Sequence, residues 1–144
     1  PSMSTERLRV GTPPIVQLSI LDQAMTAWEG VSMKDIRVAS IELSELFIKE
    51  VEARCPQLDL ASPRDATRRG SQVSFAFEEG YAAMQALIDR GVIGDFRAPN
   101  IMRFGFTPLY LDQDDIVVAA KIIEEVITNE LWRDPKYHIK SRVT

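Results

Sequence analysis

The sequence contains little of the chemistry on which metal sites and disulfide frameworks depend. Among its 144 residues there is one cysteine, Cys55, and one histidine, His138. A lone cysteine cannot close a disulfide within the chain, and these two residues together cannot make an all-Cys/His metal site. The carboxylates show no ligand spacing either, so we predict neither a disulfide nor a metal. Cys55 ends a helical pattern just before Pro56 and is expected to be a structural or surface thiol.

Long apolar runs and an excess of basic residues are also absent. No apolar run approaches the roughly 18 residues of a membrane span, and no signal-peptide pattern opens the chain. We therefore predict a cytoplasmic protein without a membrane partner. The net charge of −4 argues against a nucleic-acid partner. The nearest basic cluster, Arg64 with Arg68 and Arg69, is interrupted by Asp65 and is expected to be a solvated loop.

Hydrophobic residues make up 45% of the chain, as in ordinary globular proteins, and their spacing predicts eight elements. The expected helices cover residues 13–29, 33–55, 81–90 and 113–131, and the expected strands cover residues 58–60, 72–77, 92–96 and 101–106. The order helix, helix, strand, strand, helix, strand, strand, helix indicates an α+β fold, with helices covering one face of a small, largely antiparallel sheet. Residues from Arg133 onward are expected to form a polar, irregular tail.

The first expected helix is apolar beyond one narrow stripe, because Ile20, Met25 and Trp28 widen it. Such a helix needs a partner. The chain also opens on Pro1 rather than on methionine, which fits a piece cut from a longer protein. The partner would then be the remainder of that protein or a second subunit.

Arg103 lies inside an otherwise apolar, strand-like run over residues 99–110. Arginine is rarely buried without a partner, and its planar fork is suited to holding a carboxylate by two parallel hydrogen bonds. The residues leave two interpretations open: a structural arginine paired with one of the chain's own carboxylates, or one that binds a ligand's carboxylate. The rival arginines Arg9, Arg69 and Arg97 lie beside the acids Glu6, Asp65 and Asp95, and need no ligand.

A second candidate site lies at the segment Arg9-Val10-Gly11-Thr12. Gly11 lets the backbone approach a ligand closely, and Thr12 offers a hydroxyl next to the positive end of the helix expected from Pro13. The alternative is that Thr12 is simply the N-cap of that helix.

These segments, taken in order, resemble the C-terminal part of bacterial kynureninases over residues 8–132. Kynureninases are pyridoxal-phosphate (PLP) hydrolases of the aminotransferase-like superfamily of fold type I. The resemblance rests on the order and spacing of five segments: Gly11–Ile15, Ser62–Asp65, Arg69–Phe75, Arg90–Arg97 and the one around Arg103. It implies the fold of their C-terminal small domain, with residues 1–12 as a lead-in carrying a cofactor-contact motif, residues 13–132 as the small domain with its first interface helix, and residues 133–144 as a tail.

The resemblance further implies a homodimeric full-length enzyme that hydrolyses L-kynurenine to anthranilate and L-alanine, in tryptophan degradation and the kynurenine pathway toward NAD. In this family Arg103 matches the arginine that grips the substrate α-carboxylate, and Thr12, approached through Gly11, matches a position that reaches the cofactor. The Schiff-base lysine of the family belongs to the large domain, which precedes this region. We therefore expect no catalytic residue here and an inactive chain on its own.

None of the five lysines in this chain has a buried, strand-end context suited to a Schiff base (Lys34, Lys49, Lys121, Lys136 and Lys140). Two alternative functions remain open. One is another fold type I enzyme, a cysteine desulfurase or an aminotransferase. The other is a non-catalytic α+β binding module.

Overall fold

The computed structural model describes residue 4 and residues 11–139, and its contacts divide the chain into two compact units, 1–32 and 33–144. The first unit contains helix α1 (Ile15–Met25), followed by the 3-10 turn η2 (Thr26–Trp28). The helix begins later than the sequence predicts, because Pro14 has a ψ of 88° and lies outside it. Pro13 is kept out of the helical conformation because it precedes another proline.

The second unit carries the rest of the described secondary structure. Its helices are α2 (Met33–Arg54), α3 (Gly80–Ile88) and α4 (Gln113–Thr128), with the 3-10 turns η3 (Ala66–Arg68), η4 (Leu131–Arg133) and η5 (Pro135–His138). Its strands are β1 (Asp59–Leu60), β2 (Gln72–Ala76), β3 (Asp95–Arg97) and β4 (Ile101–Gly105). The four strands form one antiparallel sheet in the order β1-β2-β4-β3. The predicted α+β fold is confirmed.

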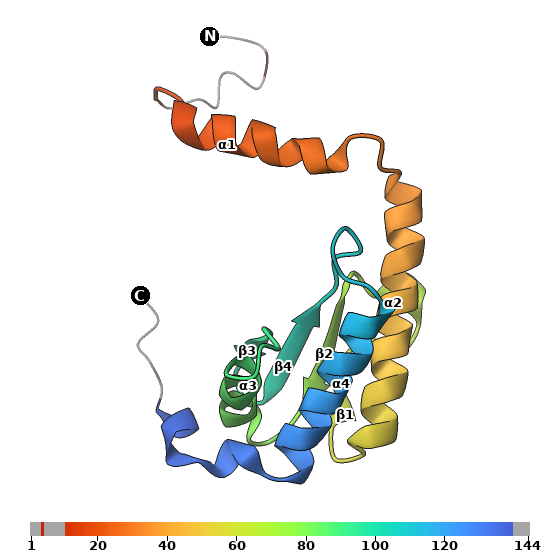
Figure 1. Ribbon diagram of the computed structural model, residues 1–144, viewed down its shortest axis with the longest axis vertical. Helices are drawn as coiled ribbons and strands as arrows, with labels where there is room; N and C mark the ends of the chain where they lie inside the picture. The colour runs from red at the N-terminus through yellow and green to blue at the C-terminus, as the bar shows by residue number, and fades with distance from the viewer. Residues whose placement is uncertain (1–3, 5–10, 140–144) are drawn as a thin grey trace. The chain divides into compact units, whose positions relative to one another are not determined.

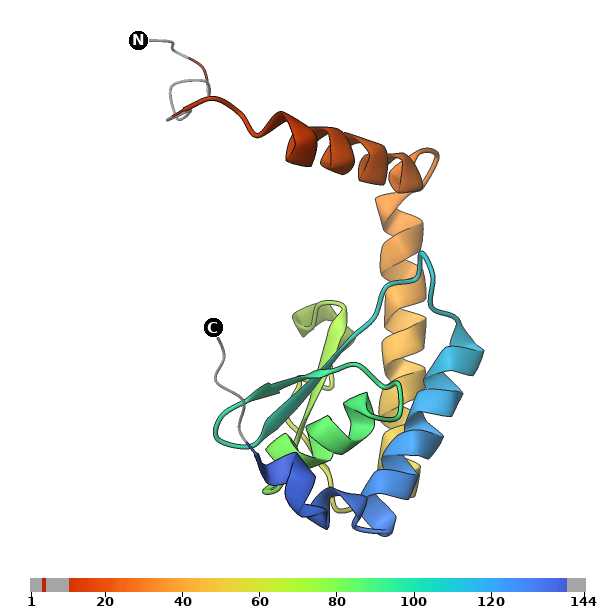
Figure 2. The same ribbon diagram turned by 60° about the vertical axis from the view of Figure 1, so that its left-hand side comes forward.

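Helices α2, α3 and α4 cover one face of this sheet, and α2 and α4 lie side by side (Figures 1 and 2). Alternation along the central strands buries Val73 and Phe75 of β2 and Met102 and Phe104 of β4 beneath them. Phe47 of α2 joins the helices to the sheet. Its ring centroid lies 6.1 Å from that of Phe75, 5.2 Å from that of Phe104 and 5.2 Å from that of Phe106.

The helix ends follow the signals in the sequence. The Asp112 side chain accepts a hydrogen bond from the backbone N–H of Asp115, and the Asp115 side chain accepts one from the backbone N–H of Asp112. The two bonds make a capping box at the start of α4. Gly91, with a φ of +87°, follows α3 in the left-handed conformation that glycine adopts without strain. The predicted strand over 92–96 begins only at Asp95 and extends to Arg97.

The expectation of a solvated loop is wrong for Arg69. Its side chain is 2% exposed and donates to the carbonyl oxygens of Pro63 and Arg64, at 2.8 and 3.0 Å. Its ion-pair partner is Glu45 of α2, rather than Asp65. The neutral carbonyl acceptors and the carboxylate together compensate the burial of the guanidinium. Arg69 therefore fastens the loop before β2 to α2.

The expectation of an irregular tail from Arg133 is wrong for residues 133–139. Tyr137 in η5 is buried, and its hydroxyl donates to Asp89 at 3.0 Å. Lys136 donates to the same carboxylate at 2.9 Å. The partners that fix this segment come from α3 and its end: the Asp89 carboxylate accepts from it, and the Tyr81 hydroxyl donates to the Ile139 carbonyl oxygen at 3.1 Å. The order of the segment could therefore not be seen in its own composition. The domain boundaries predicted after residues 12 and 132 stay predictions, while the contacts place a division at Ser32.

Candidate functional site

Arg103 lies on the face of the sheet that the helices leave open. Its chain neighbours in β4, Met102 and Phe104, are buried in the core, and successive strand residues point to opposite faces. The burial of these two neighbours therefore directs Arg103 away from the core. Its side chain is 29% exposed. The alternation in the sequence is what places a cation on this surface.

Asp95 is the partner of Arg103. The two residues stand directly opposite each other in the β3–β4 pair. Arg103 Nε donates to Asp95 Oδ1 at 3.3 Å, and Arg103 Nη2 donates to Asp95 Oδ2. These hydrogen bonds, ahead of the charge attraction, hold the pKa of Asp95 below its ordinary value. The pairing has the geometry of the structural interpretation, so the role of Arg103 in binding a ligand stays a prediction.

Asp95 also pairs with Arg97, whose Nη2 lies 3.2 Å from Asp95 Oδ2. Arg97, which the sequence places beside this acid, thus has an ion-pair partner within its own strand. Spacing along the chain could suggest this pair, since the two residues lie two positions apart on one strand face. The pair with Arg103 could not be read from spacing, because it depends on the register of the hairpin. Arg9, the remaining rival, lies outside the described residues.

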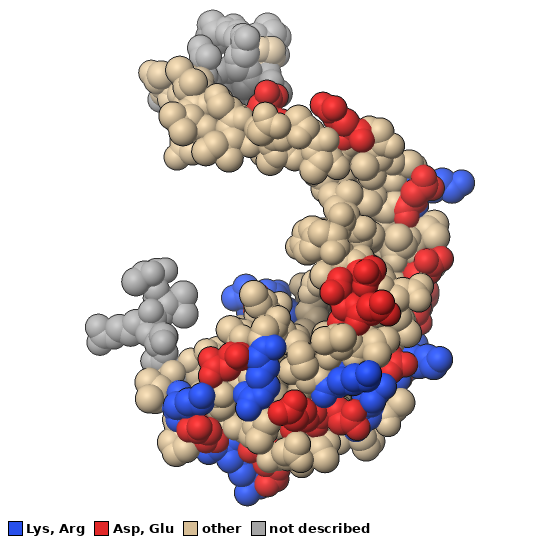
Figure 3. Space-filling model, viewed as in Figure 1, with Lys and Arg blue, Asp and Glu red and all other residues tan. Residues whose placement is uncertain are grey.

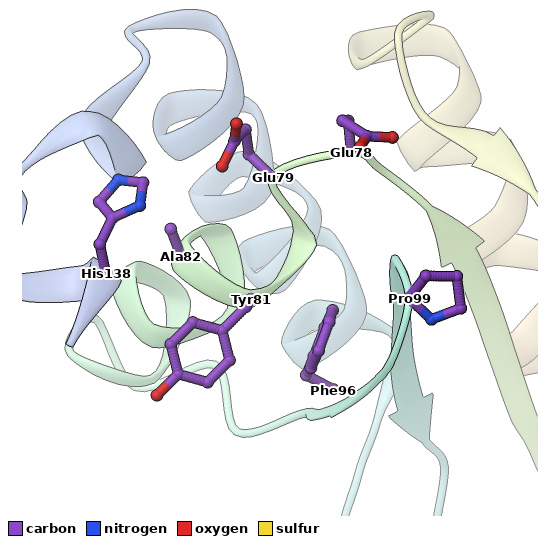
Figure 4. A pocket seen from close by; sticks show the side chains of 7 residues that line it. All are labelled: Glu78, Glu79, Tyr81, Ala82, Phe96, Pro99 and His138. Carbon is purple, nitrogen blue, oxygen red and sulfur yellow. The ribbon is translucent and has the colours of Figure 1, made fainter. Parts of the chain in front are cut away.

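Two surface pockets of the described residues lie away from Arg103. One, of about 260 Å³, is lined by Glu78, Glu79, Tyr81, Ala82, Phe96, Pro99 and His138 (Figure 4). Its two carboxylates would repel a carboxylate ligand. The other, of about 380 Å³, has an apolar floor and an acidic rim of Asp112, Asp114 and Asp115 at the start of α4. Arg103 lines neither pocket, so a ligand bound to it would need further walls.

The charges on the second unit are mixed in sign. Lysines and arginines lie interspersed with aspartates and glutamates on the face drawn in Figure 3. Ion pairs account for many of them, as with Arg54 between Glu50 and Glu124. No single-sign surface dominates this view. Among the described residues no group of histidine, cysteine and carboxylate side chains could hold a metal ion. No described helix is long and apolar enough to cross a membrane.

Gly11 and Thr12 belong to the first unit and are both exposed. The cap residue of α1 is Pro14, and no side chain caps the helix. The alternative that Thr12 is the N-cap is therefore wrong, because two prolines separate it from the first helical residue. A Cβ added at Gly11 would meet no atom of the described residues within 4 Å. A contact between Thr12 and a cofactor stays a prediction.

Comparison with known proteins decides the family. The family model described as "Kynureninase C-terminal domain" matches residues 36–123. The chain is 42% identical to "Kynureninase" of Pseudomonas fluorescens and 41% identical to "Kynureninase" of Burkholderia mallei (strain SAVP1) and of Burkholderia pseudomallei (strain K96243), in each case over the whole chain. The chain belongs to the kynureninase C-terminal domain family. It spans 35% of the length of these curated relatives.

The environment of Cys55 in this chain also argues against the desulfurase alternative. A desulfurase would place a reactive cysteine in a flexible loop. Cys55 follows α2 directly, is 0% exposed, and donates its backbone N–H to the Val51 carbonyl at 2.7 Å. Burial, with a smaller contribution from Glu124, raises the pKa of its thiol to about 11. The sequence predicts that Cys55 is either a structural or a surface thiol, and its burial makes it a structural one.

Cys55 in the folded protein is expected to react with iodoacetamide at pH 8 about 100-fold more slowly than in urea. The thiolate is the nucleophile, and raising the thiol pKa from 9.0 to about 11 lowers its thiolate fraction at this pH by about that factor. Burial slows the reaction further. Peptide-resolved mass spectrometry of timed samples measures both rates. A folded-state rate within tenfold of the unfolded one would contradict the buried placement.

Proposed function

We propose that this chain is the substrate-carboxylate-binding domain of a PLP-dependent kynureninase. In this proposal the full-length enzyme hydrolyses L-kynurenine to anthranilate and L-alanine, in the cytoplasm and as a step of tryptophan degradation. The observation that carries it is Arg103, presented on the open face of a sheet whose sequence matches the kynureninase C-terminal domain family. An α-amino acid brings a carboxylate, and a planar guanidinium fork is its natural receptor.

The role of Arg103 in this proposal is orientation. Two parallel hydrogen bonds to the α-carboxylate fix both its position and its plane, so the rest of the amino acid has one geometry relative to the reacting centre. Arg103 stands on a strand whose other face is packed in the core, so its backbone is held in place. A rigid strand defines such geometry more closely than a loop does.

The residues present are compatible with a contact to PLP. A phosphate could accept hydrogen bonds from the exposed Thr12 hydroxyl and from the backbone N–H groups at the N-terminus of α1, which no side chain caps. Gly11 has no side chain that would obstruct the approach. In our proposal Thr12 contacts the cofactor, with Gly11 permitting the approach. The chemistry that PLP supplies is the withdrawal of electrons from the bonds around the substrate Cα.

The lysines support placing the Schiff-base residue elsewhere in the full-length protein. All four described lysines are exposed: Lys34, Lys49, Lys121 and Lys136. Hydrogen bonding with Tyr137 and then with Asp89 favours the charged ammonium of Lys136 and raises its pKa. An imine-forming lysine needs the opposite, a lowered pKa. We therefore propose that the reactive lysine belongs to the large domain and that this chain alone is inactive.

The apolar surface of α1 supports a partner for the first unit. Ile15, Val16, Ile20, Leu21 and Met25 are all more than half exposed in a helix without a buried residue. A helix that is apolar around its circumference is normally buried in a larger assembly. We propose that the large domain of the same protein and a second subunit of a homodimer cover it.

Anthranilate release from L-kynurenine tests the proposed function. The complete reading frame that contains this chain is purified with PLP and compared with the 144-residue chain, using anthranilate fluorescence as the readout. We expect turnover by the complete protein only. No turnover by either would refute kynureninase activity, and conversion of other amino acids to keto acids would then favour an aminotransferase. Turnover by this chain alone would refute the assignment of the reactive lysine.

A further inference from the structure

We propose that Asp95 is a positioning residue for Arg103: it holds the guanidinium by one edge and so presents the other edge to the substrate carboxylate. This inference rests on the proposed function and deepens it. Of these two residues the family resemblance assigns a role to Arg103 only, whereas the role of Asp95 comes from the geometry of the β3–β4 hairpin.

Asp95 binds only one edge of the Arg103 guanidinium. The carboxylate binds the side edge of the guanidinium, at Nε and Nη2, with Nε donating to Oδ1 at 3.3 Å. Nη1 makes no hydrogen bond to any other residue that the structure describes. A guanidinium offers N–H donors on more than one edge. The end edge, formed by Nη1 and the second N–H of Nη2, is therefore left for a second carboxylate.

The backbone fixes the pairing of Asp95 with Arg103. Asp95 and Arg103 are partners in the strand register, so both side chains leave the same face of the sheet at neighbouring positions. Gly94 permits the close approach of the chain just before β3, since a Cβ there would lie 2.8 Å from the carbonyl oxygen of Arg103. Asp95 is therefore held beside Arg103 by packing as well as by charge.

Asp95 also sets the net charge on this face of the sheet. Asp95 is shared by Arg103 and Arg97, so the three side chains together carry one net positive charge. One incoming carboxylate would neutralise them. Asp95 thus limits the attraction of the site for anions in general, and it holds in one conformation a long side chain that would otherwise sample many. Both effects act on substrate binding more than on the chemical step.

The test is Asp95→Asn in the full-length enzyme with PLP, with Glu42→Gln, an exposed carboxylate of α2, as the charge-matched control. We expect Asp95→Asn to raise KM for L-kynurenine about tenfold and to change kcat less than threefold. The loss of a fixed guanidinium outweighs the added positive charge, and the binding that is lost is shared by the ground and transition states. Glu42→Gln should leave both constants unchanged.

A second readout separates positioning from a merely structural role. Kynuramine is kynurenine without its carboxylate, and its binding is followed, like that of L-alanine, by the absorbance of the bound cofactor. Asp95→Asn should weaken L-alanine binding about tenfold and leave kynuramine binding unchanged. In an Arg103→Ala background it should add no further loss, since residues acting through one group are not additive.

The outcomes are distinguishable. An Asp95→Asn enzyme with wild-type KM and wild-type L-alanine binding would overturn the role of Asp95 while leaving the proposed function intact. Equal weakening of L-alanine and kynuramine would show a structural role and overturn it too. If the wild-type protein binds L-alanine more tightly than Asp95→Asn does but releases no anthranilate, the role of Asp95 is supported and kynureninase activity is refuted. If the wild-type protein neither binds L-alanine more tightly nor releases anthranilate, both the role of Asp95 and kynureninase activity are refuted. If circular dichroism shows Asp95→Asn to be misfolded, Asp95→Ser takes its place in each measurement.

Discussion

Arg103→Ala in the full-length enzyme is expected to lower kcat/KM for L-kynurenine by several hundred-fold. A hydrogen bond to a charged group contributes about 1.5–3 kcal/mol, and the proposed fork makes two of them to the α-carboxylate. The side chain is 29% exposed, so solvent screening reduces the sum, and we expect a loss of about 3–4 kcal/mol in transition-state stabilisation. At about 1.36 kcal/mol per tenfold, this gives the stated effect. Steady-state anthranilate release measures it.

Two companion variants show whether the fork of Arg103 or merely its charge is responsible. Arg103→Lys keeps the charge but cannot bind bidentately, so we expect an intermediate loss of about tenfold. Arg64→Ala is the control: it removes an equal charge from an exposed side chain that pairs with Glu52 and not with Asp95, and it should change kcat/KM less than threefold. Equal losses in Arg64→Ala and Arg103→Ala would contradict a specific receptor at Arg103.

The helices and strands could be predicted because the apolar spacing of this chain reports which face each element buries. In α4 the residues Ile116, Ile123 and Val126 recur at helical spacing, and all three are buried. Alternation in β4 likewise places Arg103 on one face of the strand and its neighbours Met102 and Phe104 on the other. Local signals such as the Asp112 cap act within a few residues, so they too are visible in the sequence.

The partners of the arginines could not be predicted, because they depend on register and on carbonyl groups that no side chain announces. Asp95 precedes Arg103 by eight residues, and only the hairpin register puts them opposite each other. A slip of one residue would send one of the two to the other face. Arg69 pairs with Glu45, 24 residues away, rather than with the nearer Asp65, because the loop packs against α2 in the folded chain. The candidate site was thus predictable in its cation and not in the carboxylate that holds it.

Phe47→Ala is expected to destabilise the second unit by about 4 kcal/mol, an amount within the range for removing a buried phenylalanine. The side chain is 1% exposed and its ring meets the rings of Phe75, Phe104 and Phe106. Alanine would lose these ring contacts and leave a cavity between α2 and the sheet, which packed neighbours fill only in part. Urea unfolding followed by circular dichroism measures the change in unfolding free energy.

Val38→Ala, on the same helix, is the matched control, since Val38 is 50% exposed and its truncation should change the unfolding free energy by less than about 0.5 kcal/mol. A loss below about 1.5 kcal/mol for Phe47→Ala would contradict the described packing. The effect should also reach the candidate site. Phe104, which Phe47 contacts, precedes Gly105 and follows Arg103 on β4, so loosening its core face loosens the strand that presents the guanidinium. At temperatures well below the unfolding transition of the full-length enzyme, we therefore expect Phe47→Ala to raise KM for L-kynurenine and Val38→Ala to leave it unchanged.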